Sequence, residues 1–81
     1  MIAYVLIQVG PRQSRVVVEK LKQFPFVEEA AAVYGDIDII ARLDVPDNEA
    51  LDHVVMDQIQ DIPEINSTLT LIGIESISWT R

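Results

Sequence analysis

The chain has 81 residues, with six basic and thirteen acidic side chains and a formal net charge of −7. An electric field of this sign repels phosphate groups, so the composition argues against direct nucleic-acid binding and against anionic membrane surfaces. Because there is no cysteine and a single histidine, the sequence excludes disulfides and offers no ligand set for a metal.

The length fits one domain covering residues 1–81, and a domain of this size buries only about 60–65% of the surface that its unfolded chain exposes. Association with further copies is therefore an expected source of additional stability. The apolar start of the chain is too short for a secretory signal, and no stretch approaches the ~20 apolar residues of a membrane span. A soluble, cytoplasmic protein is expected.

The first half of the chain predicts a strand, a helix and a strand. An apolar strand is expected over about residues 3–9, ended by Gly10-Pro11, with the proline suited to the first turn of a helix. Three apolar residues then recur with helical spacing: Val17, Leu21 and Phe24. Pro25 ends this helix, because the residue before a proline is disfavoured in the α region. A strand over about Val27–Tyr34 follows, and Gly35-Asp36 forms the turn.

The second half predicts the same three elements. Residues 38–45 alternate between apolar and mostly polar positions, as in a strand, and Asp47 or Asn48 is expected to cap the next helix. That helix has an apolar stripe with Val54 beside it: Leu51, Val55, Ile59 and Ile62. Pro63 ends it, and a β-branched strand covers Thr68 to Ile72. The residues after Gly73, through Trp79, are expected to add a short fifth strand or an arm.

The two halves are related by an offset of 38 residues. Phe24-Pro25-Phe26-Val27 corresponds to Ile62-Pro63-Glu64-Ile65, and Gly35 corresponds to Gly73. Chance similarity between two amphipathic stretches is the alternative. Each half reads βαβ, and two intercalated right-handed βαβ units give a ferredoxin-like α+β sandwich, a four-stranded antiparallel sheet with both helices on one face.

The sheet face that the helices leave uncovered is expected to be apolar. In the first strand Tyr4 and Leu6 oppose an equally apolar set, and in the last strand Leu69 and Leu71 oppose Thr70 and its neighbours. An uncovered face of a monomer is normally polar, whereas an apolar patch usually marks an interface. This predicts a homodimer packed sheet to sheet, with further assembly into a ring; the alternative is a monomer with an irregular face.

The sequence contains no recognisable catalytic apparatus. His53 is the only imidazole, and it is expected to be a solvated helix residue. No Ser-His-Asp set, cysteine nucleophile or glycine-rich phosphate loop is present, so no catalytic residue, cofactor or metal is predicted. Lys20 and Lys22 are expected to be solvated. Arg12 and Arg15 suit an anion near the first loop, although surface charge is the favoured interpretation.

The candidate ligand site is the turn between the two halves, Tyr34-Gly35-Asp36-Ile37-Asp38. Carboxylates beside free backbone N–H groups can hold a zwitterion, since a carboxylate accepts from its ammonium group and N–H groups donate to its carboxylate. Asp38 is the favoured residue because the strand that it opens fixes it. A plain polar hairpin is the alternative, and the local chemistry alone favours that alternative.

Five motifs together resemble the effector-binding RAM domain of the Lrp/AsnC transcription regulators, over about residues 2–75. These are Gly10-Pro11, Phe24-Pro25-Phe26-Val27, Gly35-Asp36-Ile37-Asp38, Pro63-Glu64-Ile65 and Thr68-Leu69-Thr70. Ile37 departs from the RAM pattern, which has an aromatic residue there. The resemblance implies dimers packed through their sheets, rings of dimers, and amino-acid effectors bound between dimers near the turn and the last strand.

Carried over residue by residue, the resemblance makes Gly35, Asp36, Ile37, Asp38, Thr68 and Thr70 effector-site candidates, beside Tyr34. Regulators of this family carry a helix-turn-helix before the RAM domain, whereas Met1 here falls directly at the first strand. The chain therefore resembles the stand-alone RAM proteins, the alternative being a truncated piece of a longer regulator. The resemblance to stand-alone RAM proteins implies that the chain does not bind DNA itself. It implies a role in sensing an amino acid, or in co-assembling with full-length Lrp/AsnC regulators and modulating them.

Two alternatives share the predicted strand and helix order. A dimeric α+β-barrel enzyme needs histidine, asparagine or aromatic residues in a cleft on the sheet, where this sequence offers mainly aliphatic ones. An ACT-like amino-acid-binding domain would bind its ligand near Gly10-Pro11-Arg12. An RNA-binding domain of this fold is disfavoured, because it needs basic charge and exposed aromatic residues on the central strands.

Overall fold

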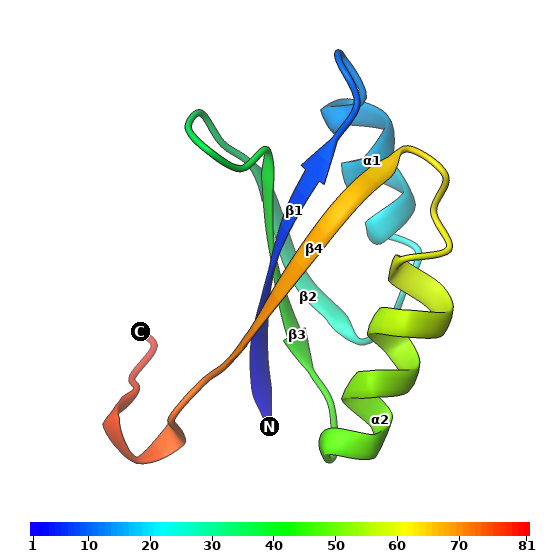
Figure 1. Ribbon diagram of the computed structural model, residues 1–81. Coiled ribbons are helices and arrows are strands. Elements are labelled where there is room, and N and C mark those ends of the chain that lie inside the picture. The colour runs from blue at the N-terminus through cyan, green and yellow to red at the C-terminus, as the bar shows by residue number, and fades with distance from the viewer.

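The computed structural model describes every residue from Met1 to Arg81, and its elements follow the predicted βαββαβ order (Figure 1). The strands and helices are β1 (Ile2–Val9), α1 (Ser14–Leu21), β2 (Val27–Ala32), β3 (Ile39–Asp44), α2 (Asn48–His53) and β4 (Ile65–Ile72). A π-helical segment, η1 (Val54–Ile59), continues α2, and a single 3-10 turn, η2 (Glu75–Ile77), follows β4.

The sheet has the strand order β2-β3-β1-β4, and all of its neighbours are antiparallel. Both crossover helices lie on one face, and the opposite face carries no helix (Figure 1). The predicted ferredoxin-like sandwich is therefore confirmed.

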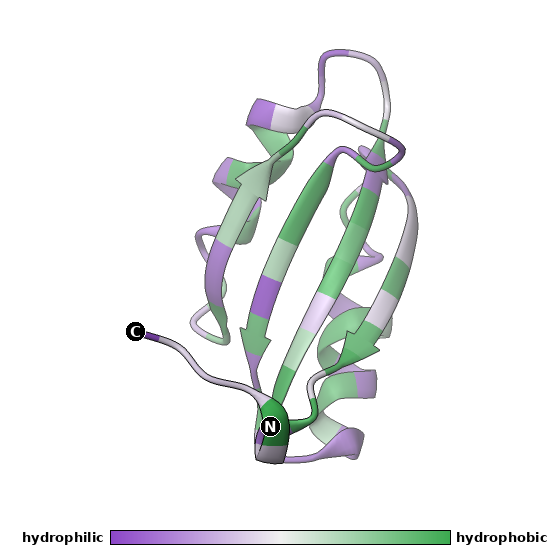
Figure 2. Ribbon diagram, turned by 90° about the vertical axis from the view of Figure 1, so that its left-hand side faces the viewer, coloured by the Kyte–Doolittle hydropathy of each residue, from purple (hydrophilic) through white to green (hydrophobic).

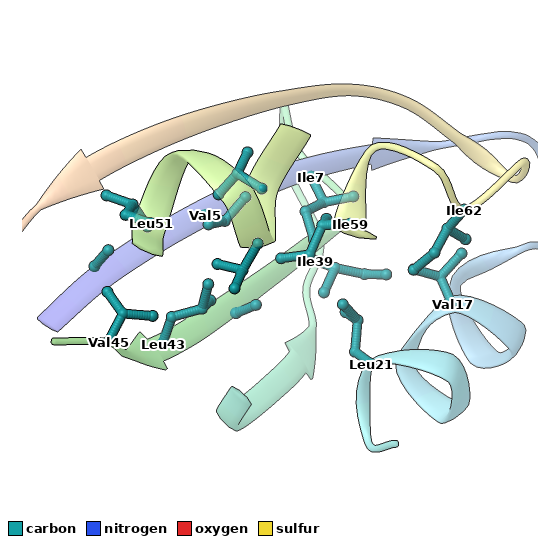
Figure 3. Packing of buried hydrophobic residues seen from close by; sticks show 14 residues of the cluster. Val5, Ile7, Val17, Leu21, Ile39, Leu43, Val45, Leu51, Ile59 and Ile62 are labelled. Carbon is teal, nitrogen blue, oxygen red and sulfur yellow. The ribbon is translucent and has the colours of Figure 1, made fainter. Parts of the chain in front are cut away.

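The core lies between the helices and the two central strands (Figure 3). Alternate residues of β1 and β3 point into it and are fully buried: Ala3, Val5, Ile7, Ile39, Ala41 and Leu43. The helices complete it with Val17, Leu21, Leu51, Val55 and Ile59. Residues related by the offset of 38 share this burial, as Leu21 and Ile59 illustrate, because both halves place the same helical position against the sheet.

The first helix is shorter than predicted. Pro11 and Arg12 form a turn, in which Arg12 has a φ of 61°, and the helix begins only at Ser14. The prediction that Pro11 lies in its first turn is therefore wrong. The helix also ends at Leu21, and Phe24 lies beyond it, stacked on Phe26 with ring centroids 5.2 Å apart. Phe24 thus packs beside the core from a turn.

The second helix begins as predicted, since the Asp47 side chain accepts a hydrogen bond of 2.8 Å from the Ala50 N–H. From Val54 onward the turns widen, and the Gln60 N–H donates to the Val55 carbonyl, which is five residues earlier, at 2.9 Å. This π-helical segment was not predicted. It buries the adjacent pair Val54 and Val55 together with Ile59.

Two further boundaries differ from the prediction. The strand expected to reach Tyr34 ends at Ala32, and the last strand begins at Ile65, three residues earlier than expected. Residues 74–81 form no fifth strand and extend as an arm instead, the second of the two predicted outcomes. None of the helices has the length and apolar character needed to cross a lipid bilayer.

Candidate functional site

The predicted turn is a six-residue connection, residues 33–38, closed by backbone hydrogen bonds. The Val33 N–H donates to the Asp38 carbonyl at 2.8 Å, and the Asp38 N–H donates to the Ile7 carbonyl at 3.0 Å. Gly35 has a φ of 130°, which side chains rarely tolerate, so a glycine is needed here. The Tyr34 side chain is fully exposed, and Ile37 is half-buried.

The two carboxylates of the turn have different surroundings. Asp38 Oδ2 accepts a hydrogen bond from the Val9 N–H at 2.9 Å, which fixes the end of β1 to the start of β3. The Asp36 side chain takes part in no hydrogen bond, but its backbone carbonyl accepts from Gln8 Nε2 at 2.9 Å. Asp38 is thus a structural clamp with one oxygen, Oδ1, still free to accept, whereas the Asp36 carboxylate is unpaired.

The two candidate threonines lie on β4, with β1 between them and β3. Thr68 pairs in register with Ile7, and Thr70 pairs with Val5, so both side chains share the sheet face that the helices cover. Thr68 Oγ1 accepts from Gln60 Nε2 at 2.8 Å. Thr68 therefore lies at the same end of the sheet as the turn, and Thr70 lies two residues further away. A single chain does not bring these threonines into one pocket with the turn.

The uncovered face of the sheet is apolar, as predicted. We call it the open face; it carries Tyr4, Leu6, Ile40, Leu69 and Leu71, which the strand register places side by side. Leu69 is 59% exposed and Leu71 47% exposed. Figure 2 looks onto this face, with the helices behind it. Polar side chains border this apolar patch, Gln8 and Ser67 at one end and Glu29, Arg42 and Asp44 toward the other. Arg42 Nη1 donates to Glu28 Oε1 at 3.3 Å.

Two features were missed from the sequence. A groove of about 370 Å³ runs between the second helix and the edge strand β4, lined by Asn48, Leu51, Asp52, Val55, Met56, Thr70 and Ile72. Its sequence signal is the i, i+4 spacing of Asn48, Asp52 and Met56, beside the apolar stripe that contains Leu51 and Val55. Lys20, predicted to be solvated, has a side chain that is 43% exposed but also forms an unpredicted salt bridge to Glu64, with Nζ and Oε1 2.6 Å apart.

Electrostatic effects are modest elsewhere. Lys20 donates a hydrogen bond to the Glu64 carboxylate, which holds the pKa of Glu64 below its ordinary value. His53 is an exposed helix residue, as predicted, with Nδ1 2.7 Å from Asp57 Oδ2. Arg12 and Arg15 are exposed and form no salt bridge. No group of three or more His, Cys, Asp or Glu side chains is arranged to hold a metal ion.

The strand order and the two helices on one face define the chain as a ferredoxin-like sandwich. The sequence model of the Lrp/AsnC ligand binding domain matches residues 2–81, and the chain belongs to this family. The family resemblance drawn from the sequence motifs is thereby confirmed.

Known relatives agree with this assignment. The chain is 30% identical over 78 residues to the HTH-type transcriptional regulator PH0140 of Pyrococcus horikoshii, covering 96% of this chain but 49% of that protein. It thus spans about half the length of this curated relative. The structure of AsnC from E. coli superposes with a TM-score of 0.90 at 27% identity, covering 99% of this chain and 54% of that one.

Two further structures share the fold. The crystal structure of FFRP-DM1 matches with a TM-score of 0.87 at 36% identity, covering 90% of this chain and 97% of that one. The regulator NMB0573 of Neisseria meningitidis, solved as a complex with L-Met, matches with a TM-score of 0.86. At 17% identity over 98% of this chain and 53% of that one, the latter shows the fold alone. The comparisons make this chain a regulatory domain related to transcription regulators.

Proposed function

We propose that this domain binds a small amino acid at the interface between its own copies and thereby modulates Lrp/AsnC transcription regulators. The observation that carries the proposal is an apolar, exposed sheet face on a domain of a ligand-binding family. Leu6 pairs across the sheet with both Ile40 and Leu69, so the open face is a contiguous patch rather than scattered residues. Patches of this kind mark interaction sites.

The turn residues supply chemistry suited to a zwitterion. The unpaired Asp36 carboxylate and the free oxygen of Asp38 can accept from an ammonium group, while the backbone N–H groups of residues 34–37, which donate no hydrogen bond within the chain, can donate to a carboxylate. Binding sites normally bury most of the ligand surface, yet Tyr34 is fully exposed. A second copy must therefore provide the missing walls, so ligand binding and self-association are expected to be coupled.

The relatives support the regulatory part of the proposal. PH0140 is described as a transcriptional regulator, and NMB0573 was solved with L-Met bound. The composition, with its net charge of −7, favours action on other regulators rather than direct contact with DNA. Such a role places the protein in the cytoplasm. The open face offers mainly aliphatic side chains, which favours a non-enzymatic function over the dimeric α+β-barrel enzyme.

The test combines molecular mass with ligand titration. Sedimentation equilibrium of the wild type is expected to show dimers or larger rings, and Leu69→Asp is expected to give monomers, because it buries a charge in the interface. At least one of the twenty amino acids should raise the melting temperature of the wild type through ligand linkage. Asp36→Asn should abolish that increase without changing the fold.

The controls separate the alternatives. Arg12→Ala should leave the ligand effect intact, whereas its loss in this variant alone would favour the ACT-like site at the first loop. A wild type that stays monomeric at tens of micromolar and responds to no amino acid would refute the proposed function.

A further inference from the structure

The residues after β4 form an arm that is weakly attached to its own sheet. We define the arm as residues 74–81. The last backbone hydrogen bond to the sheet is from the Gly73 N–H to the Ile2 carbonyl, at 2.8 Å. Beyond it, the arm's backbone N–H groups bond only within the arm, at Ile77 and Ser78. The remaining polar link is Glu75, whose Oε1 lies 3.4 Å from the amino group of Met1.

The arm exposes large apolar side chains. Ile77 is 80% exposed and Trp79 is 76% exposed, and the Arg81 guanidinium lies 5.1 Å from the Trp79 ring centroid. In so small a domain these residues would normally be buried, and here the arm leaves them in solvent at the cost of the hydrophobic effect. The single chain therefore leaves both apolar side chains of the arm largely in solvent.

The arm lies on the same side of the molecule as the open face. It leaves β4 away from the helices and crosses the lower end of the sheet (Figures 1 and 2). A cavity of about 210 Å³ separates it from the sheet, lined by Ile2, Tyr4, Arg42, Gly73, Glu75, Ser78, Trp79 and Thr80. Since Tyr4 belongs to both the cavity and the open face, the arm and that face form one continuous surface.

We infer that the arm clasps a second copy of this chain, packing Ile77 and Trp79 against it when the two open faces meet. This inference rests on the self-association proposed above. A second copy docked on the open face would contact the arm, because the arm borders that face. In a two-fold symmetric dimer the arm of each copy then packs against the other copy. Arg81 forms no salt bridge within the chain, so its guanidinium group beside Trp79 is available to acidic groups of a second copy, whose net charge is −7.

Trp79 is the only tryptophan of the chain, so its fluorescence reports the arm directly. The experiment follows tryptophan emission and iodide quenching through a dilution series, beside sedimentation equilibrium on the same samples. We expect the emission to shift to shorter wavelength and the quenching to fall as concentration rises, with the midpoint set by the dissociation constant from sedimentation. Leu69→Asp should keep the emission of a solvated tryptophan at every concentration.

Variants of the arm supply the second measurement. Ile77→Ser keeps the fluorophore and should weaken self-association by about tenfold or more, as expected for an interface anchor. Met56→Ser is the matched control, because Met56 is similarly exposed but lies on the helix side of the sheet, and its dissociation constant should equal that of the wild type.

The outcomes distinguish this inference from the proposed function. Self-association with unchanged tryptophan emission, and with wild-type affinity in Ile77→Ser, would overturn the role of the arm and leave the dimer standing. A chain that remains monomeric throughout would remove both.

Discussion

Replacing Asp38 by alanine should destabilise the domain even when no ligand is present. Asp38 Oδ2 accepts from the half-buried Val9 N–H at 2.9 Å, where β1 ends against the start of β3. In Asp38→Ala this donor loses its partner, while the bond from the Asp38 N–H to the Ile7 carbonyl is retained. The substitution therefore isolates one side-chain hydrogen bond at the junction of the two central strands.

The size of the effect follows from the burial of that donor. A hydrogen bond to a charged group is worth about 1.5–3 kcal/mol, and an unsatisfied donor costs about 1–3 kcal/mol, the lower part applying where water retains access. We expect a loss of about 1.5 kcal/mol in the free energy of unfolding. For a domain of this length that corresponds to a fall of roughly 6–12 °C in the melting temperature.

Thermal and urea unfolding followed by circular dichroism measure this loss, and two variants serve as controls. Asp38→Asn retains an acceptor oxygen and should lose less than half as much. Asp36→Ala removes a carboxylate that makes no hydrogen bond, so its stability should lie within ~0.5 kcal/mol of the wild type. Wild-type stability in Asp38→Ala would refute the clamp and return Asp38 to a role in ligand binding alone.

Two further predictions concern the Glu64 salt bridge and the glycine of the turn. The pKa of Glu64 is lowered from 4.5 by the hydrogen bond from Lys20, so its contribution to stability is present above pH 4.5 and is lost as pH falls through the folded-state value. Glu64→Gln should thus have a lower free energy of unfolding than the wild type at pH 7, and urea titrations should show this difference closing below pH 4.5. A difference that does not depend on pH would contradict this. Glu19→Gln, in the exposed pair with Lys22, is the control. Gly35→Ala should lower the free energy of unfolding by about 1–3 kcal/mol, because alanine is strained at a φ of 130° although nothing lies near the added methyl group. Gly10→Ala should be nearly neutral in the same urea assay. Equal stabilities of the two variants would refute the argument from strain.

The fold was predictable because burial in this chain follows simple periods. Buried residues 39, 41 and 43 alternate with less buried ones, as a strand buried on one side requires. In each half a buried helical residue follows another by four positions, Leu21 after Val17 and Ile59 after Val55. Prolines marked the region where each helix ends. The apolar character of the open face could likewise be predicted from the sequence, since both faces of β1 are apolar and the helices cover only one of them.

The parts that were not predictable depend on contacts between distant segments. Lys20 and Glu64 lie 44 residues apart, and only the packed fold brings them together. The π-helical turns after Val54 bury two adjacent valines, Val54 and Val55. The helix preferences of single residues do not predict such turns. For the candidate site, the turn could be located from Gly35 and its neighbours, but the use of Asp38 as an acceptor for Val9 could not, because their proximity arises from sheet register.

The strand order β2-β3-β1-β4 means that every strand pairing joins one half of the repeat to the other. Neither β1 with β2 nor β3 with β4 forms a ladder, so a lone βαβ half has no sheet at all. During synthesis β1 and β2 have no strand partner until β3, which begins at Ile39, is made. Such non-local pairing makes folding slow, and it joins the two halves and the turn between them into one sheet, to which the arm is attached only through the end of β4.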